Sequence, residues 1–524
     1  MTTQIKFDWK EILNEKRSTD SQRNGGKQDY DKRNAFENDF DRITFSSSLR
    51  RLQDKAQVFP LEKKDYVRTR LTHSLEVSTL ARSLGISVGR SLNEKEKEFT
   101  EDNMAEMSAI LACAGLIHDI GNPPFGHFGE QAIRDWFNDY FTDDIDRKKE
   151  RNLTHTIKIK DVENYSELSE QQKQDFLNFE GNAQALRLLT KLNFFIDDKG
   201  MNLTYGVLSS IIKYPKKSTE VGKVKEDIAY KKMGYFEAEE ELFNEISKKV
   251  GIGSKRNPLT FLLEAADDIA YKAADIEDGL NKGVLTYEII HSKLESLIPE
   301  KELKVYKETY NEIIKRNQEQ SKGKVELGNE LKIFFEDKCN YQMLSSLEGY
   351  YAKAQEIGYE DPSTYAIQRF RVSVQGIMMN AVVKSFMNNL EDIMCGEFRT
   401  ELLKVSDANE ISEALKQLAI EHIFKDKNVV RLEILGHRVI CGLLDIFVPA
   451  VLSKDYLNTS TKHGKIYHLI STNYKFVNRE YHCGEWGKDP NYLYNRLLLV
   501  TDFICSMTDS YALELYQELT GVKL

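Results

Sequence analysis

The sequence is poor in residues that interrupt helices and in cysteines that could staple a fold. Its 524 residues include only 9 prolines, 29 glycines and 6 cysteines. The cysteines are scattered and form no Cys-x-x-Cys pair, which predicts reduced thiols and argues against a disulfide framework. With so few prolines and glycines, we expect long helices rather than many short strands.

Segments that would direct the chain to a membrane are also missing. The N-terminal stretch MTTQIKFDWKEILNEKR has no apolar core of the kind found in signal peptides. No run approaches the roughly 18 apolar residues that can span a bilayer. The apolar stretch 439–452 is short and interrupted by Asp445, so we expect a buried helix there. The composition predicts a soluble, cytoplasmic protein that does not bind membranes.

The charge balance excludes one further class of protein. A net charge of −10 argues against a protein that coats nucleic acid over its whole surface, although it allows a local basic groove. The hydrophobic fraction of 41% and the charged fraction of 30% are typical of a soluble globular protein. The length is sufficient for several domains.

Apolar residues recur at helical spacing, and the sequence contains no repeat, no sustained heptad pattern and no alternation of strands and helices. The sequence therefore predicts an all-α fold. We expect helices at 39–59, 73–89, 104–117, 180–192, 203–212 and 259–280, and a helical pattern from 284 to the end.

The remaining segments are expected to lie outside helices. These are a polar N-terminal arm (1–35), a polar insertion (141–178), an exposed lysine-rich loop (213–233) and a hairpin near 473–481. The predicted organisation is the arm, a core at 36–283 and a helical C-terminal region at 284–524.

Two histidines and two aspartates form the strongest chemical signal. They are His73 in RLTHSLE, His118 and Asp119 in GLIHDIGN, and Asp267 in EAADDIAY. Two imidazoles and two carboxylates can hold one divalent cation such as Mg, Mn, Fe, Co or Ni, with positions left for water and a phosphate oxygen. The alternative is structural: a histidine at a helix C-terminus interacts with the dipole, and the aspartate caps the next turn.

Two neighbouring features bear on this site. Asp267, Tyr271 and Asp275 share one helix face, while the adjacent Asp268 leaves the choice of ligand open. The segment NPPFGHFGE follows the His118-Asp119 pair, and its prolines and glycines predict a rigid loop. Such a loop would hold His127 and Glu130 near the metal, where an imidazole can protonate a leaving oxygen and a carboxylate can orient it. A loop histidine bonded to backbone is the alternative.

The order H…HD…D resembles the HD-domain phosphohydrolases. The stretches RTRLTHSLEV, HDIGNPPFGHFGE, NFEGNAQALRLL and EAADDIAY together resemble one branch, the deoxyguanosine triphosphate triphosphohydrolases (dGTPases), in its longer bacterial form. The resemblance implies an HD-domain helical core at 36–283 and hydrolysis of dGTP, or of other dNTPs, to deoxynucleoside and tripolyphosphate. It also implies one divalent metal per site and places the fourth ligand at Asp267.

The resemblance further implies a role for each candidate residue. Catalysis falls to His127 with Glu130 as its partner. Substrate contacts fall to Gln53 at the guanine edge, Arg70, Lys213 and Tyr214 at the phosphates, and Tyr271 and Asp275 at the sugar and phosphates. The alternative for Gln53, Arg70 and Lys213 is a solvated side chain. The chain departs from the family at Ala56, where Thr is frequent, and near Ser506, where Gly is usual.

The late segment 502–509 is interpreted as helix packing or a subunit contact. The resemblance also implies a homo-oligomer, often a hexamer, and regulation by nucleotide or single-stranded DNA, for which the lysine-rich segment 213–232 is a candidate patch. The rival functions are a broad dNTPase or another HD-type nucleotide hydrolase, and a DNA- or nucleotide-binding regulatory protein. His463, His468, His482 and Cys483 lack zinc-site spacing, so core or surface roles are expected for them.

Overall fold

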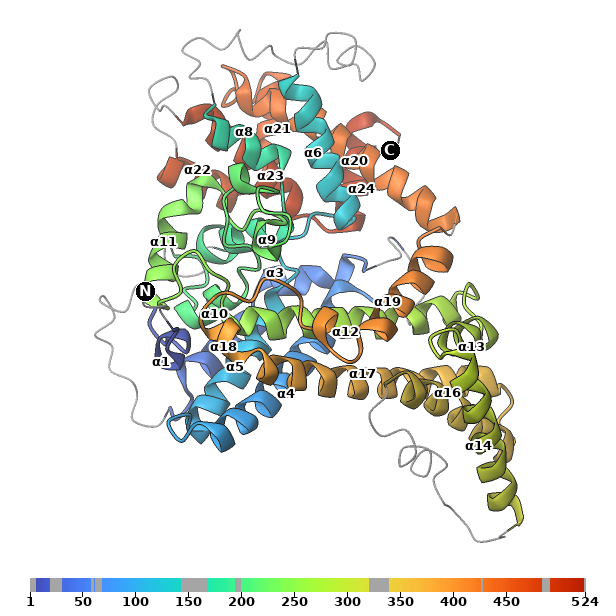
Figure 1. Ribbon diagram of the computed structural model, residues 1–524. Coiled ribbons are helices and arrows are strands. Elements are labelled where there is room, and N and C mark those ends of the chain that lie inside the picture. Colours follow the sequence, from blue (N-terminus) through green and yellow to red (C-terminus); the bar gives the residue numbers. More distant parts are fainter. Residues whose placement is uncertain are drawn as a thin grey trace. The chain divides into compact units, whose positions relative to one another are not determined.

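The computed structural model describes residues 6–18, 31–57, 61, 68–142, 168–193, 199–319, 339–425, 427–482 and 491–522. Within these ranges the chain consists of helices and turns without a strand, and Ala56 and Thr69 form an isolated antiparallel bridge (Figure 1). The predicted all-α fold is confirmed.

The chain forms two compact units. The first combines Met1–Leu263, Asp392–Arg399 and Arg431–Leu524, and the second combines Glu264–Glu391 with Thr400–Val430. The predicted segments 1–35, 36–283 and 284–524 are continuous stretches of sequence, whereas each unit joins separated stretches. The predicted domain boundaries therefore stay a prediction.

The helices of the first unit are α1 (Trp9–Ile12), α2 (Ala35–Thr44), α3 (Ser47–Arg51), α4 (Arg70–Lys95), α5 (Glu101–Ile117), α6 (His127–Phe141), α8 (Glu170–Leu177), α9 (Gly181–Arg187), α10 (Tyr205–Ser210), α11 (Glu240–Lys249), α21 (Lys462–Leu469), α22 (Thr472–His482), α23 (Tyr492–Cys505) and α24 (Asp509–Thr520). Those of the second are α13 (Tyr287–Glu295), α14 (Glu300–Glu319), α16 (Cys339–Glu356), α17 (Pro362–Asn388) and α19 (Asn409–Leu418). The division between the units falls within α12 (Pro258–Asn281), α18 (Leu390–Met394) and α20 (Lys427–Leu452).

Short 3-10 or π turns supplement these helices: η1 (Leu52–Asp54), η4 (Leu188–Leu192), η5 (Ser218–Glu220), η6 (Ile228–Tyr230), η7 (Glu237–Glu239), η8 (Leu403–Val405) and η9 (Ala419–Ile423). The predicted helix at 180–192 is thus α9 continued by the π turn η4. The predicted helix at 39–59 is divided, because the Ser46 hydroxyl accepts a hydrogen bond from the Leu49 amide and caps a new helix, α3.

The α4–α5 pair supports the region of the predicted metal ligands. α4 begins with a reciprocal cap in which the Thr72 hydroxyl accepts from the Thr69 amide at 3.0 Å. The two helices lie side by side (Figure 1) and bury apolar residues from both. They approach most closely at Gly115, where an added Cβ would lie 2.4 Å from the Ser78 backbone. A glycine therefore lets the end of α5 contact α4, three residues before His118.

Several sequence-based expectations are wrong. The predicted hairpin at 473–481 is helix α22, in which Tyr474 and Val477 are buried at helical spacing. The predicted insertion at 141–178 contains helix α8, while its residues 143–167 lie outside the described ranges. Within the predicted polar arm, Phe7 and Ile12 are buried.

The lysine-rich segment 213–233 is not an exposed loop along its length. Lys213, Tyr214 and Lys216 are all buried. The Gly234 amide donates to the Lys216 carbonyl at 2.9 Å, and an added Cβ at Gly234 would lie 1.7 Å from the Tyr214 carbonyl oxygen. This close backbone contact holds the two ends of the segment together, which a composition rich in lysine does not indicate.

One helix among the described residues is long and apolar enough to cross a membrane. It covers Val429–Leu452 of α20, with a mean hydropathy of 1.7, and 56% of this window is buried within the structure. Core helices of soluble proteins meet the same criteria, so this helix is weak evidence for a membrane span. Val439, Ile440 and Phe447 are fully buried, which confirms the buried helix expected at 439–452.

Candidate metal centre

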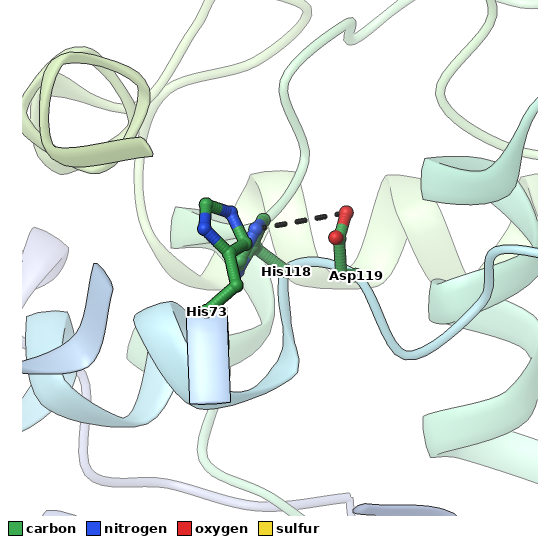
Figure 2. Close-up of side chains that lie close together, drawn as sticks. All are labelled: His73, His118 and Asp119. Atoms are coloured by element: carbon green, nitrogen blue, oxygen red, sulfur yellow. Dashed lines mark ion pairs between the residues drawn. The ribbon is translucent and has the colours of Figure 1, made fainter. Parts of the chain in front are cut away.

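Three of the four predicted metal ligands converge in the first unit. His73 lies in the first turn of α4, His118 ends α5, and Asp119 follows directly. One potential ligand atom from each of the three lies within 4.8 Å of the others (Figure 2). Both histidines are buried, and the Asp119 side chain is 16% exposed. The sequence prediction that these residues meet is therefore supported by the geometry.

The orientation of His118 suits a metal ligand. Its Nδ1 lies 2.8 Å from the Gly115 carbonyl oxygen. In the tautomer that donates from Nδ1, the Nε2 lone pair points away from this bond, and Nε2 lies 3.6 Å from Oδ1 of Asp119 (Figure 2). Metal-bound histidines are commonly held by such a bond from the second ring nitrogen. The residues present thus fit a divalent cation with mixed nitrogen and oxygen ligands.

The Asp119 carboxylate is held by two further side chains. Asn122 Nδ2 donates to its Oδ1 at 2.7 Å, and the Arg70 guanidinium donates to its Oδ2 at 2.5 Å. Sequence reasoning missed Asn122, although its place three residues after Asp119 in a Gly-Asn-Pro turn is a usable signal. Arg70 was predicted to bind phosphate, and in the structure its guanidinium donates to a predicted metal ligand.

The fourth predicted ligand, Asp267, lies on α12 in the second unit, so its meeting with the other three stays a prediction. Its neighbour Asp268 forms an ion pair with Lys272, with 3.3 Å between Oδ2 and Nζ. The choice of Asp267 over Asp268 as a ligand stays a prediction. Further along α12, the Tyr271 ring stacks on Phe424 with 6.4 Å between centroids, and Asp275 is buried.

His127 and Glu130 form the predicted pair at the start of α6. His127 Nδ1 lies 3.3 Å from Oε2 of Glu130, and the histidine side chain is 75% exposed while the glutamate is buried. Burial raises the pKa of Glu130, but the hydrogen bond and charge of His127, and then the charges of Lys232 and Arg134, outweigh it and hold the pKa below its usual value. Glu130 is therefore an ionised partner for an accessible imidazole.

A second buried carboxylate lies next to this pair. The Gly181 amide donates to Glu130 Oε1 at 2.9 Å, and the preceding residue, Glu180, pairs with Lys232 at 2.7 Å. Burial and then repulsion from Glu130 raise the pKa of Glu180. Lys232 ends the lysine-rich segment that was expected to be solvated, and its sequence context gives no signal of this pairing.

Lys55 is another residue that sequence reasoning missed. Its buried ammonium donates to the carbonyls of Asn122 at 2.6 Å and Cys505 at 2.7 Å. Burial lowers the pKa of Lys55 to about 8. The lysine therefore holds the backbone at Asn122, and through it the turn that follows the two ligands His118 and Asp119.

The remaining predicted substrate residues occupy different environments. Gln53 is exposed in η1, whereas Lys213 and Tyr214 are buried in the first unit. Tyr205, just upstream, donates its hydroxyl to Glu245 at 2.5 Å. The substrate roles of Gln53, Lys213 and Tyr214 stay predictions.

The late segment 502–509 takes part in helix packing. Arg187 Nη2 donates to one Asp502 oxygen at 2.8 Å, and Gln184 Nε2 donates to the other at 2.9 Å. Arg187 also pairs with Glu239 at 2.8 Å. This buried network joins α9, α23 and η7, in agreement with the packing interpretation.

A second group of potential ligands among the described residues lies in the second unit. His291 Nε2 is 2.8 Å from Glu348 Oε1, and its Nδ1 is 4.0 Å from Glu295 Oε2. The ring thus lies between two carboxylates, one at each nitrogen, whereas a metal takes a single nitrogen of a ring. Lys307 and the Tyr306 hydroxyl engage the same carboxylates. The group fits a bridge between α13 and α16 better than a metal site.

Comparison with known proteins agrees with this picture. The HD-domain family model matches residues 70–181, a stretch that contains the three converging ligands and the His127–Glu130 pair but ends before Asp267. A deoxyguanosinetriphosphate triphosphohydrolase-like protein of Listeria monocytogenes serovar 1/2a is 42% identical, over 98% of this chain and 99% of the relative.

Two more distant relatives also match over nearly the full length. A protein with the same name from Synechocystis sp. is 32% identical over 99% of this chain and 100% of the relative. A Yersinia enterocolitica protein named deoxyguanosinetriphosphate triphosphohydrolase is 30% identical over 94% of this chain and 95% of the relative. The converging HD residues, the helical fold and these matches together show that the chain belongs to the deoxyguanosinetriphosphate triphosphohydrolase family of HD-domain enzymes.

Proposed function

We propose that this chain hydrolyses deoxynucleoside triphosphates, with dGTP preferred, to the deoxynucleoside and tripolyphosphate. The observation that carries the proposal is the convergence of His73, His118 and Asp119, followed in the chain by a turn that bears the His127–Glu130 pair. The names of the relatives supply the substrate class.

In this reaction water attacks the α-phosphorus, and the bond between that phosphorus and the 5′-oxygen breaks. A divalent cation held by His73, His118, Asp119 and the predicted ligand Asp267 would supply positive charge for the α-phosphate and an activated water. Mg, Mn, Fe, Co and Ni all suit this ligand set.

The 5′-oxygen needs a proton as it leaves, and His127 is placed to give it. Glu130 accepts at Nδ1, so Nε2 of the exposed ring is the nitrogen that can meet a substrate. A general acid must present its proton to the leaving oxygen, and the bond to Glu130 orients the ring so that Nε2 can do this. The tripolyphosphate takes up the attacking oxygen, and the deoxynucleoside takes up the proton.

The substrate carries several negative charges, and cationic side chains offset them. Arg70 lies between Asp119 and the turn before His127, because an added Cβ at Gly126 would fall 2.2 Å from Arg70 Nη2. We assign further contacts to residues named from the resemblance: Gln53, Lys213, Tyr214, Tyr271 and Asp275.

The test is chromatography of the products from metal-loaded protein with each of the four dNTPs and GTP, alone and in pairs. Deoxynucleoside plus tripolyphosphate is expected, and monophosphate plus pyrophosphate would refute the bond assigned here. His127→Ala is expected to lose turnover while it retains metal. Gln131→Ala, an exposed position on the same helix, is the matched control and should keep full activity.

From the resemblance we also propose a cytoplasmic homo-oligomer, a hexamer, that binds single-stranded DNA. Light scattering after size-exclusion chromatography tests the oligomer, and a salt-dependent gel shift tests DNA binding.

A further inference from the structure

We infer that Asp509 is a positioning residue that sets the direction of His127 and couples it to the segment bearing Gln53. This inference rests on the function proposed above. Asp509 is the first residue of α24 and follows its cap, Thr508. It is far from both segments in the sequence, so no motif joins the three.

The Asp509 carboxylate uses both of its oxygens to bind backbone amides. Oδ1 accepts from the Phe125 amide at 2.9 Å, and Oδ2 accepts from the Ala56 amide at 2.9 Å. The side chain is buried, with 2% of the residue exposed. Two charge-assisted bonds to one buried carboxylate fix the two backbone segments relative to each other.

The Phe125 side of this bridge holds an unusual turn. Phe125 has φ of 62° and Gly126 has φ of 59°, so two consecutive residues adopt the left-handed region directly before His127. A side chain such as phenylalanine rarely adopts this region, and the surrounding contacts must hold it there. The bond to Asp509 is one such contact. Without it the turn can relax, and the start of α6, with His127, would change direction.

The Ala56 side of the bridge holds the segment that follows Gln53. The neighbouring Ser510 hydroxyl donates to Asp54 Oδ1 at 2.8 Å, which adds a second link from the start of α24. Gln53 and Asp54 both belong to η1. The start of α24 therefore binds both the segment of Gln53, which is proposed to recognise the nucleobase, and the turn that is proposed to orient His127.

The metal ligands are held by other groups. Asp119 is bonded to Asn122 and Arg70, and His118 is bonded to the Gly115 carbonyl. Loss of the Asp509 carboxylate should therefore impair proton donation by His127 and recognition of the nucleobase by Gln53, while metal binding is retained. A residue that only stabilised the fold would affect all three.

The variant Asp509→Asn tests this inference. Asparagine has one acceptor oxygen, so one of the two amides would face an NH₂ group instead. We expect kcat to fall by about 10- to 100-fold, because a small misplacement of a catalytic group has effects of this order. The ratio of kcat/KM for dGTP to kcat/KM for dATP should fall. The metal affinity should stay within about twofold of the wild-type value. Glu518→Gln makes the same chemical change at an exposed position of α24 and is the control.

A second variant separates positioning from stability. In a His127→Ala background, Asp509→Asn should not lower the residual kcat at saturating dGTP, because the acid that Asp509 positions is already gone and impaired base recognition acts on KM. If Asp509→Asn lowers that residual rate by its full factor, or lowers metal affinity in parallel with kcat, the positioning role is wrong.

Hydrogen exchange followed by mass spectrometry provides a readout that does not need turnover. Asp509→Asn should raise exchange in the peptides around 54–57 and 121–130 together, and Glu518→Gln should raise neither. Unchanged exchange in these peptides would overturn the coupling. If the wild-type chain turns over no dNTP while the exchange rises as expected, the proposed function fails and the coupling between the two segments stands.

Discussion

The Arg70 guanidinium donates to Oδ2 of Asp119, so the arginine expected to bind phosphate is bonded to a carboxylate expected to bind metal. Arginine has five N–H donors, and one bond to Asp119 leaves others for a phosphate. The pair therefore connects the proposed phosphate contact of Arg70 with the proposed metal ligand Asp119. It also places a positive charge next to the proposed cation site, with the Asp119 carboxylate between the two.

Replacing Arg70 tests this link. Arg70→Ala should lower kcat/KM for dGTP by about 100-fold, because a charge-assisted phosphate contact and the orientation of Asp119 are lost together. Arg70→Lys keeps the charge but lacks the planar fork, so it should recover only part of the loss. Steady-state kinetics with saturating Mn²⁺ measures both effects. Full recovery by lysine would show that charge alone matters.

Asn122→Ala should weaken metal binding. Its amide holds Oδ1 of Asp119, the oxygen that faces His118. Loss of such an outer partner typically reduces metal affinity or activity by about 10- to 100-fold. Calorimetric titration of the metal-free protein with Mn²⁺ measures the change. Asn138→Ala, an exposed position on α6, is the control, and equal affinities in the two variants would contradict the role of Asn122.

The Lys232–Glu180 pair should contribute to stability through charge balance. Lys232→Met leaves Glu180 buried beside Glu130 without its cation, so we expect a lower melting temperature. Glu180→Gln in the Lys232→Met background removes the stranded charge and should restore part of the loss. Lys231→Met, at the preceding residue, is the control. Thermal unfolding of the wild type, Lys232→Met, Glu180→Gln and the double variant gives the coupling, and additive effects would rule out the pair.

Asp175 should make stability depend on pH. Burial, opposed by bonds from Ser218, Tyr494 and the Glu237 amide, raises the pKa of Asp175 from 3.8 to about 7. The folded protein then holds a proton that the unfolded chain releases, so this contribution to stability is full below pH 3.8 and is lost as the pH rises through about 7.

Asp175→Asn lacks this group, so the free energy of unfolding that the wild type gains between pH 8 and pH 5 should be larger than the gain in the variant. Denaturant unfolding of both proteins at the two pH values measures the difference. An identical pH dependence would show that Asp175 is ionised in the folded protein at both values.

The sequence was sufficient for the all-α fold and for the meeting of His73, His118 and Asp119. Helical spacing predicted α4 and α5, and the glycine-rich crossing of these helices brings the end of one to the start of the other. These features depend on local pattern and on ligand chemistry, which a sequence displays directly.

The side chains that hold the backbone around the candidate metal centre could not be predicted from local sequence pattern. Lys55, Lys232 and Asp509 find their partners through tertiary packing, and local sequence pattern names none of these partners. The hairpin expected at 473–481 failed for a related reason, because the burial of Tyr474 and Val477 follows the helical period. The roles of Asp267, Tyr271 and Asp275 remain predictions.

The turn at Phe125 limits the substitutions that this protein can accept. A non-glycine residue in the left-handed region destabilises a fold by about 1–3 kcal/mol. The Phe125 ring compensates by packing against Gly436 of α20, where an added Cβ would lie 2.6 Å from the ring. Glycine at 125 would relieve the backbone strain but would also remove the ring from its buried place against Gly436. The left-handed turn and this ring therefore depend on each other, and a substitution at either position must preserve both.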